Sequence, residues 1–115
     1  MSREIKFRVW DEQNEVFRYW GFLPNGFSGI DENDMGEGYI KENSEQFTGL
    51  TDKNGKEIYE GDKMLCPATA AIPEEHTITI TWANNHCGFI GDRKAMNQSV
   101  YWASMYGEIV GNIHE

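Results

Sequence analysis

The first twenty residues alternate between apolar and polar side chains in a pattern that predicts a β-hairpin. Within Glu4–Trp10 every second residue is apolar, and this period of two is typical of a strand with one buried face. The polar face of that strand would carry Glu4, Lys6 and Arg8. A polar turn, Asp11–Glu15, separates it from a second apolar run, Val16–Trp20. We therefore expect two antiparallel strands joined by a loop of five residues.

A second hairpin is predicted in the C-terminal half. Thr77–Trp82 alternates threonine with isoleucine and tryptophan, Ala83–His86 has the composition of a turn, and Cys87–Gly91 is apolar enough to return as the paired strand. Glu108–His114 alternates again, so it predicts a closing strand.

Glycine, asparagine and proline divide the middle of the chain. Asn54-Gly55 suits the positive φ angles of a tight turn and is the strongest turn signal in the sequence. Gly61-Asp62 is expected to bend the chain before Lys63–Cys66, which predicts a strand whose far end is limited by Pro67.

Gly21–Asn43 has no clean period and predicts a long, irregular loop with one short strand near Tyr39-Ile40. Four of its residues form an acidic cluster: Asp31, Glu32, Asp34 and Glu37. Their spacing does not match that of a calcium-binding loop, so we interpret the acidic loop, residues 30–45, as solvated.

Asp92–Tyr106 leaves two alternatives open, a helical turn at Lys94–Gln98 or a strand at Val100–Trp102. The whole pattern favours a mostly-β fold, a small barrel-like or sandwich-like domain of about six or seven short strands with little helix. We expect one domain over residues 1–115, a length that supports a core without disulfides or metals. The two hairpins could also mark β-lobes at 1–44 and 45–115.

The net charge of −9 makes the chain strongly acidic. Because such a chain repels phosphate backbones, direct nucleic-acid binding is disfavoured. The acids either serve solubility alone or form a surface that docks a basic partner or mimics DNA. Cys66 and Cys87 are too few for a disulfide framework and are expected to be reduced and partly buried. With no signal-peptide pattern and no run near the ~20 apolar residues of a membrane span, we expect a cytoplasmic protein.

No motif in the sequence specifies catalysis or metal binding. The candidate zinc ligands are Cys66, His76, His86, Cys87 and His114. They form no Cys-x-x-Cys or His-x-x-x-His pair, and the adjacent His86 and Cys87 would point to opposite faces of a strand. Cys87 could pair with His76 or His86 as nucleophile and base, but nothing beside it other than His86 favours a thiolate. Glu60 and Asp62 flank Gly61, and we interpret them as turn residues rather than as an acid–base pair, with Asp62 accepting from backbone amides. We predict no catalytic, cofactor-binding or metal-binding residue.

Aromatic residues are more numerous than a core of this size requires. The surplus is drawn from Trp10, Tyr19, Trp20, Trp82, Tyr101, Trp102 and Tyr106. Because aromatic side chains are enriched in binding surfaces, we expect one aromatic patch to be exposed or to lie in a subunit interface.

Three segments, residues 3–11, 46–62 and 108–115, carry a family resemblance. Their sequences are REIKFRVWD, QFTGLTDKNGKEIYEGD and EIVGNIHE. In this order they resemble the YopX family of bacteriophage and prophage proteins. The resemblance implies a mostly-β fold, a phage or prophage origin and the cytoplasm of the bacterial host. It implies no known activity and no site residues. Residues 21–43 and 67–106 match the family less closely, so a function particular to this chain is expected there.

Three hypotheses about function follow. The leading one is a non-enzymatic phage accessory protein that binds a host or phage macromolecule, most simply a protein partner not yet identified. The alternatives are an acidic DNA mimic or inhibitor of a basic host protein, and a small enzyme with an unrecognised site. Homo-oligomerisation is compatible with all three. A continuous negative stripe would favour the mimic, and a deep pocket joining a histidine with Cys87 or a carboxylate would favour the enzyme.

Overall fold

The computed structural model describes residues 5–23, 26–29, 36–93 and 97–115. These ranges contain nine strands, two α-helices and one 3₁₀ turn. The strands are β1 (Ile5–Asp11), β2 (Val16–Leu23), β3 (Gly26–Ser28), β4 (Glu45–Thr51), β5 (Glu57–Tyr59), β6 (Asp62–Cys66), β7 (His76–Ala83), β8 (Gly88–Asp92) and β9 (Glu108–Asn112). The helices are α1 (Glu37–Asn43) and α2 (Val100–Tyr106), and the 3₁₀ turn η1 covers Asn84–His86.

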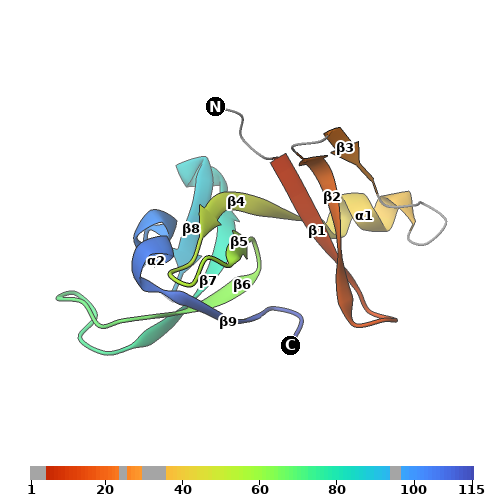
Figure 1. The fold of residues 1–115 in the computed structure, drawn as a ribbon. Coiled ribbons are helices and arrows are strands. Elements are labelled where there is room, and N and C mark those ends of the chain that lie inside the picture. Colours follow the sequence, from red (N-terminus) through yellow and green to blue (C-terminus); the bar gives the residue numbers. More distant parts are fainter. Residues whose placement is uncertain (1–4, 24–25, 30–35, 94–96) are drawn as a thin grey trace.

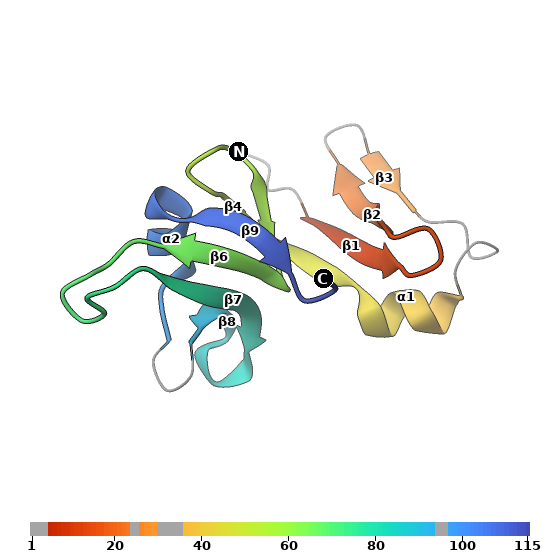
Figure 2. The same cartoon turned by 90° about the horizontal axis from the view of Figure 1, so that it is seen from below.

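The strands form two antiparallel sheets that do not close into a barrel. Strand order is β3-β2-β1-β4-β5 in the first sheet and β8-β7-β6-β9 in the second. In Figure 1, β1–β3 and α1 lie on one side, β6–β9 and α2 lie on the other, and β4 runs between them. Figure 2 shows β9 beside β6 with the C-terminus next to β1. The predicted mostly-β, sandwich-like fold is therefore confirmed.

Both predicted hairpins are confirmed. The first pairs β1 with β2 from Ile5↔Phe22 to Asp11↔Val16, and the second pairs β7 with β8 from Thr79↔Asp92 to Ala83↔Gly88. The expected closing strand is β9, which pairs with β6. Within the described ranges the strands exceed the predicted six or seven, because no strand had been assigned where β3, β4 and the short β5 lie.

The Asn54-Gly55 turn is confirmed, and Asp52 fixes its shape. Gly55 has a φ of 84°, which glycine adopts without steric cost. Asp52 Oδ1 accepts from the Asn54 and Lys56 amides at 2.9 Å each, and Asp52 Oδ2 accepts from Ile109 N at 2.9 Å. One buried carboxylate thus ties this turn to the start of β9.

The helices α1 and α2 lie in segments for which the sequence predicted a strand or a loop. The strand expected near Tyr39-Ile40 is wrong, because both residues lie in α1. The strand alternative at Val100–Trp102 is also wrong, because these residues begin α2. Ser99 Oγ accepts from Trp102 N and caps this helix. Val100 and Ala103, three residues apart, both face the core.

Two other predictions fall on residues outside the described ranges. The acidic residues Asp31, Glu32 and Asp34 lie there, so their solvated state stays a prediction. Residues 94–96 of the alternative helical turn lie there too, whereas Gln98 forms an isolated β-bridge with Gly91. The division into lobes at 1–44 and 45–115 stays a prediction as well. The first sheet crosses that boundary, because Arg8 on β1 is paired with Glu45 on β4.

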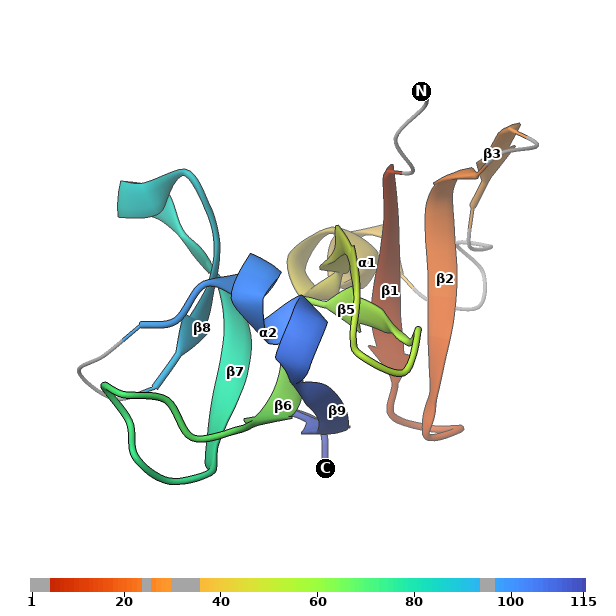
Figure 3. The same ribbon diagram turned by 60° about the vertical axis from the view of Figure 1, so that its left-hand side comes forward.

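The aliphatic core lies between the second sheet, α2 and β5, an arrangement visible in Figure 3. Its buried residues are Ile58, Met64, Cys66, Ile78, Ile80, Val100 and Ala103. Burial of each large aliphatic side chain contributes about 1.5–3 kcal/mol. Among the described residues, no helix has the length and apolar character that a membrane crossing requires.

Candidate functional site

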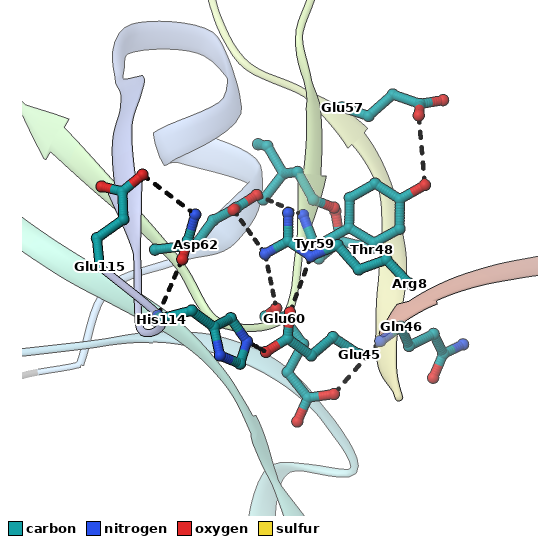
Figure 4. A network of polar contacts seen from close by, with 12 residues as sticks. Arg8, Glu45, Gln46, Thr48, Glu57, Tyr59, Glu60, Asp62, His114 and Glu115 are labelled. Atoms are coloured by element: carbon teal, nitrogen blue, oxygen red, sulfur yellow. Dashed lines mark hydrogen bonds and ion pairs between the residues drawn. The ribbon is translucent and has the colours of Figure 1, made fainter. Parts of the chain in front are cut away.

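A buried ionic cluster, made of Arg8, Glu45, Asp62 and His114, joins the two sheets (Figure 4). Arg8 Nε donates to Glu45 Oε1 at 2.8 Å, and its Nη2 donates to Asp62 Oδ1 at 2.8 Å. His114 Nε2 lies 2.9 Å from Glu45 Oε2. The exposed fractions of Arg8, Glu45 and Asp62 are only 5%, 6% and 2%. These three charged side chains are therefore largely removed from water.

Aromatic rings enclose the cluster. The Arg8 guanidinium lies 4.0 Å from the centroid of the Phe17 ring and 4.8 Å from that of Tyr59. The His114 ring stacks on Trp10 with 5.3 Å between centroids. Contacts of a cation with aromatic faces are attractive and grow stronger when water is excluded. These rings therefore pack on the Arg8 guanidinium and hold the C-terminal segment against β1 and β2.

Burial governs the electrostatics of this region. It raises the pKa of Asp62, although the Tyr59 amide donates to Asp62 Oδ2 at 2.8 Å and Arg8 also favours the carboxylate. Burial likewise raises the pKa of Tyr59 and of Glu60. Throughout the described residues, every buried side-chain nitrogen and oxygen has a hydrogen-bond partner. A fully satisfied cluster of this kind is typical of a structural network.

The prediction from the sequence was wrong about the environment of Arg8 and included only one of the two roles of Asp62. Alternation placed Arg8 on a polar face, but β4 and β6 bring Glu45 and Asp62 onto it. Asp62 does accept from a backbone amide, that of Tyr59, as its interpretation as a turn residue required. Its second role, neutralising Arg8, has no local signal, because the two residues are 54 positions apart.

The zinc-ligand and nucleophile candidates are placed in different settings. Cys66 is fully buried in the core, and burial raises its pKa to about 11. Cys87 was expected to be partly buried in a strand, which is wrong, because it is exposed and follows η1 with a φ of 51°. His76 is buried with Nε2 2.8 Å from Gln98 Oε1. His114 belongs to the ionic cluster. Among the described residues, no three histidine, cysteine or acidic side chains gather in a metal-binding group.

A groove of about 480 Å³, here called the uncharged groove, lies where α2, β8 and β4 meet. It is lined by Thr48, Leu50, His86, Phe89, Ile90, Asn97, Gln98, Ser99, Val100 and Tyr101. Tyr101 is 65% exposed at its rim, and Phe89 continues the aromatic surface to Trp82 with 5.1 Å between ring centroids. Trp82 is 46% exposed. The expectation of an exposed aromatic patch is thus met in part by Tyr101 and Trp82.

A second hollow of about 250 Å³ lies beside the ionic cluster. Its walls include Arg8, Asp62, Tyr19, Lys56 and Glu115. This hollow holds carboxylates without a histidine, and the uncharged groove holds His86 without Cys87 or a carboxylate. In the described part of the chain, neither hollow therefore assembles the pair of groups that would favour the enzyme hypothesis.

A protein-family model described as YopX protein matches residues 6–115. No curated protein matches the chain. The matched range contains almost all of the three segments that carried the resemblance. Each of them supplies one member of the ionic cluster, namely Arg8, Asp62 and His114. Glu45, directly before the second segment, contacts both Arg8 and His114.

Proposed function

The chain belongs to the YopX protein family, and we propose that it is a non-enzymatic accessory module that binds a protein partner through the uncharged groove. The phage or prophage setting, in the cytoplasm of the bacterial host, rests on the same resemblance. The groove lies within residues 48–101, and most of its lining comes from the part of the chain that resembles the family least.

The observation that carries this proposal is the character of the groove. Among the described residues that line it, none is an acid, a lysine or an arginine, although the chain has a net charge of −9. Its floor includes Leu50, Phe89 and Val100, which also pack on the core, and its rim presents the exposed ring of Tyr101. Concave, mostly apolar surfaces with a few polar groups and an aromatic rim are typical of binding sites.

The two alternative hypotheses have less support. A DNA mimic needs its acids on the surface, and among the described residues Asp11, Glu45, Asp52 and Asp62 are buried and do not contribute to such a surface. Asp11 accepts from Arg18, and Glu45 and Asp62 accept from Arg8, so these carboxylates serve internal pairs. For an enzyme, the described residues offer a groove that holds His86 without Cys87 or a carboxylate, and a cluster whose buried side-chain polar atoms are all hydrogen-bonded.

The experiment is affinity capture from phage-infected or prophage-carrying cells with wild-type protein and two variants. Tyr101→Ser removes the exposed ring at the groove rim, and Tyr106→Ser is its matched control. Both rings are on α2 and both are largely exposed, at 65% and 52%, but Tyr106 does not line the groove. We expect one protein to be captured reproducibly by the wild type and by Tyr106→Ser, and to be lost with Tyr101→Ser.

The same protein is then purified and its affinity measured directly with each variant. Loss of an anchoring aromatic side chain typically costs 1–2 kcal/mol or more, or about tenfold or more in Kd. Absence of any reproducible partner contradicts the proposal, and so does a partner that binds Tyr101→Ser as tightly as the wild type.

A further inference from the structure

Beside the uncharged groove, β8 is an edge strand of the second sheet. Gly91 N donates to Gln98 O, and Gln98 N donates to Gly91 O, both at 2.8 Å. These two bonds show that the backbone groups of Gly91 point away from β7. Because this direction alternates along an antiparallel strand, the N–H and C=O of Phe89 point the same way.

After Gln98 the chain turns away from the β8 edge at Ser99, so it does not pair with Phe89. In an antiparallel ladder that contains the bridge Gly91↔Gln98, the residue opposite Phe89 would be Val100. Val100 is instead the first residue of α2, whose start is capped by Ser99. Among the described residues, no segment pairs with β8 on its outer side beyond that bridge.

The uncharged groove lies at this position. Phe89 and Ile90 line it from the strand, Gln98 and Ser99 line it where the chain departs, and Tyr101 lines it from the helix. An open strand edge next to an apolar groove suits an extended segment, which can satisfy backbone groups and bury a side chain at the same time.

We infer that the groove takes an extended peptide segment of the partner, which adds to β8 by pairing with Phe89. This inference rests on the proposed function and specifies its mode of binding. One residue of the segment exchanges two backbone hydrogen bonds with Phe89, and its apolar side chain lies against Leu50 and Tyr101.

The charge of the groove lining and the net charge of the chain indicate which kind of peptide segment binds. The described part of the lining has no acid, lysine or arginine, so the residue that enters the groove is apolar. The net charge of −9 attracts basic proteins over longer distances and raises their rate of association. We therefore assign the occupant as an apolar-centred strand of a basic protein.

The probe is a synthetic peptide taken from random twelve-residue sequences displayed and selected on the wild-type protein. Amide exchange measured by NMR reports the pairing. When the peptide binds, exchange of the Phe89 amide is expected to slow by about tenfold or more, while the Gly91 amide, already bonded to Gln98, changes little.

Two N-methylated forms of that peptide provide the matched control. One carries the methyl group on the residue opposite Phe89, and the other on the next residue, whose amide points away. We expect the first to bind about five- to tenfold more weakly, as the loss of one backbone hydrogen bond predicts, and the second to bind as the parent does.

The outcomes separate this inference from the proposed function. A peptide that requires Tyr101 but leaves Phe89 exchange unchanged overturns strand addition and leaves the groove as a binding site. Failure of all peptides and of the capture experiment overturns both. Light scattering that shows a dimer of wild type and a monomer of Tyr101→Ser would make a second copy of this chain the occupant, contrary to the inference.

Discussion

Replacement of Arg8 by methionine tests whether the ionic cluster holds the two sheets together. Methionine keeps an unbranched apolar chain between Phe17 and Tyr59 but removes the guanidinium. Glu45 and Asp62, 6% and 2% exposed, then lose the cation that bonds to both at 2.8 Å.

The magnitude follows from the burial of both carboxylates. Breaking a buried ion pair by removing one partner costs about 3–5 kcal/mol, because an uncompensated charge stays in the interior. Typical domains unfold with only about 5–15 kcal/mol. We therefore expect Arg8→Met to lower the free energy of unfolding by about 3–5 kcal/mol, a large fraction of the total.

The assay is urea denaturation at pH 7 followed by tryptophan fluorescence, since Trp10 stacks on His114 within the cluster. Arg93→Met is the matched control. Arg93 is 3.8 Å from Glu74, whose side chain is 73% exposed, so its loss should cost no more than about 1 kcal/mol.

A pH series identifies the cause. Burial already raises the pKa of Asp62, and removal of Arg8 raises it further. A raised pKa in the folded state means that the folded protein holds the proton more tightly than the unfolded chain, so stability falls as pH rises. The deficit of Arg8→Met should therefore shrink as pH is lowered from 7 toward the usual carboxyl range, and Asp62→Asn should recover part of it. If Arg8→Met costs no more than Arg93→Met, or if its deficit is independent of pH, the reasoning is refuted.

Three further predictions concern single groups. Asp52→Asn should lower the free energy of unfolding at pH 7 by about 1–3 kcal/mol, because the new amide cannot accept from all three backbone donors, Ile109 N among them. Burial opposes ionisation of Asp52, but those donors outweigh it and lower the pKa of the carboxyl. Its contribution to the free energy of unfolding is therefore present above pH 3.8 and lost as the pH falls below that value. Denaturation of wild type and variant at pH 7 and pH 3 would show this loss. Gly61→Ala should lower the free energy of unfolding by about 1–3 kcal/mol more than Gly55→Ala. Both glycines have positive φ, but only at Gly61 would the new Cβ lie 2.7 Å from Glu45 Oε2. Equal losses of stability in thermal or urea unfolding would contradict this prediction. In native protein a thiol reagent should modify exposed Cys87 and not Cys66, whose burial raises its pKa to about 11, and rapid reaction of two thiols without denaturant would show that the core is open.

Strong local patterns predicted the elements that they encode directly. The alternation before Trp10 and at Thr77–Trp82 predicted β1 and β7, because a strand with one buried face leaves a period of two in its own residues. Asn54-Gly55 predicted a turn because the backbone there needs positive φ. The helix α2 was missed because its seven residues are held by Val100 and Ala103 packing on a core assembled from distant strands.

By itself, the sequence of this protein determined the two hairpins, the closing strand β9, the Asn54-Gly55 turn, the net charge of −9 and which family the chain resembles. Those properties depend on neighbouring residues or on simple sums. Only the tertiary structure decided that Arg8, a polar-face residue by alternation, is buried between Glu45 and Asp62. It also decided that the departure of the chain at Ser99 leaves Phe89 on an open edge beside the uncharged groove. Both depend on contacts between residues far apart in sequence, for which no local pattern exists.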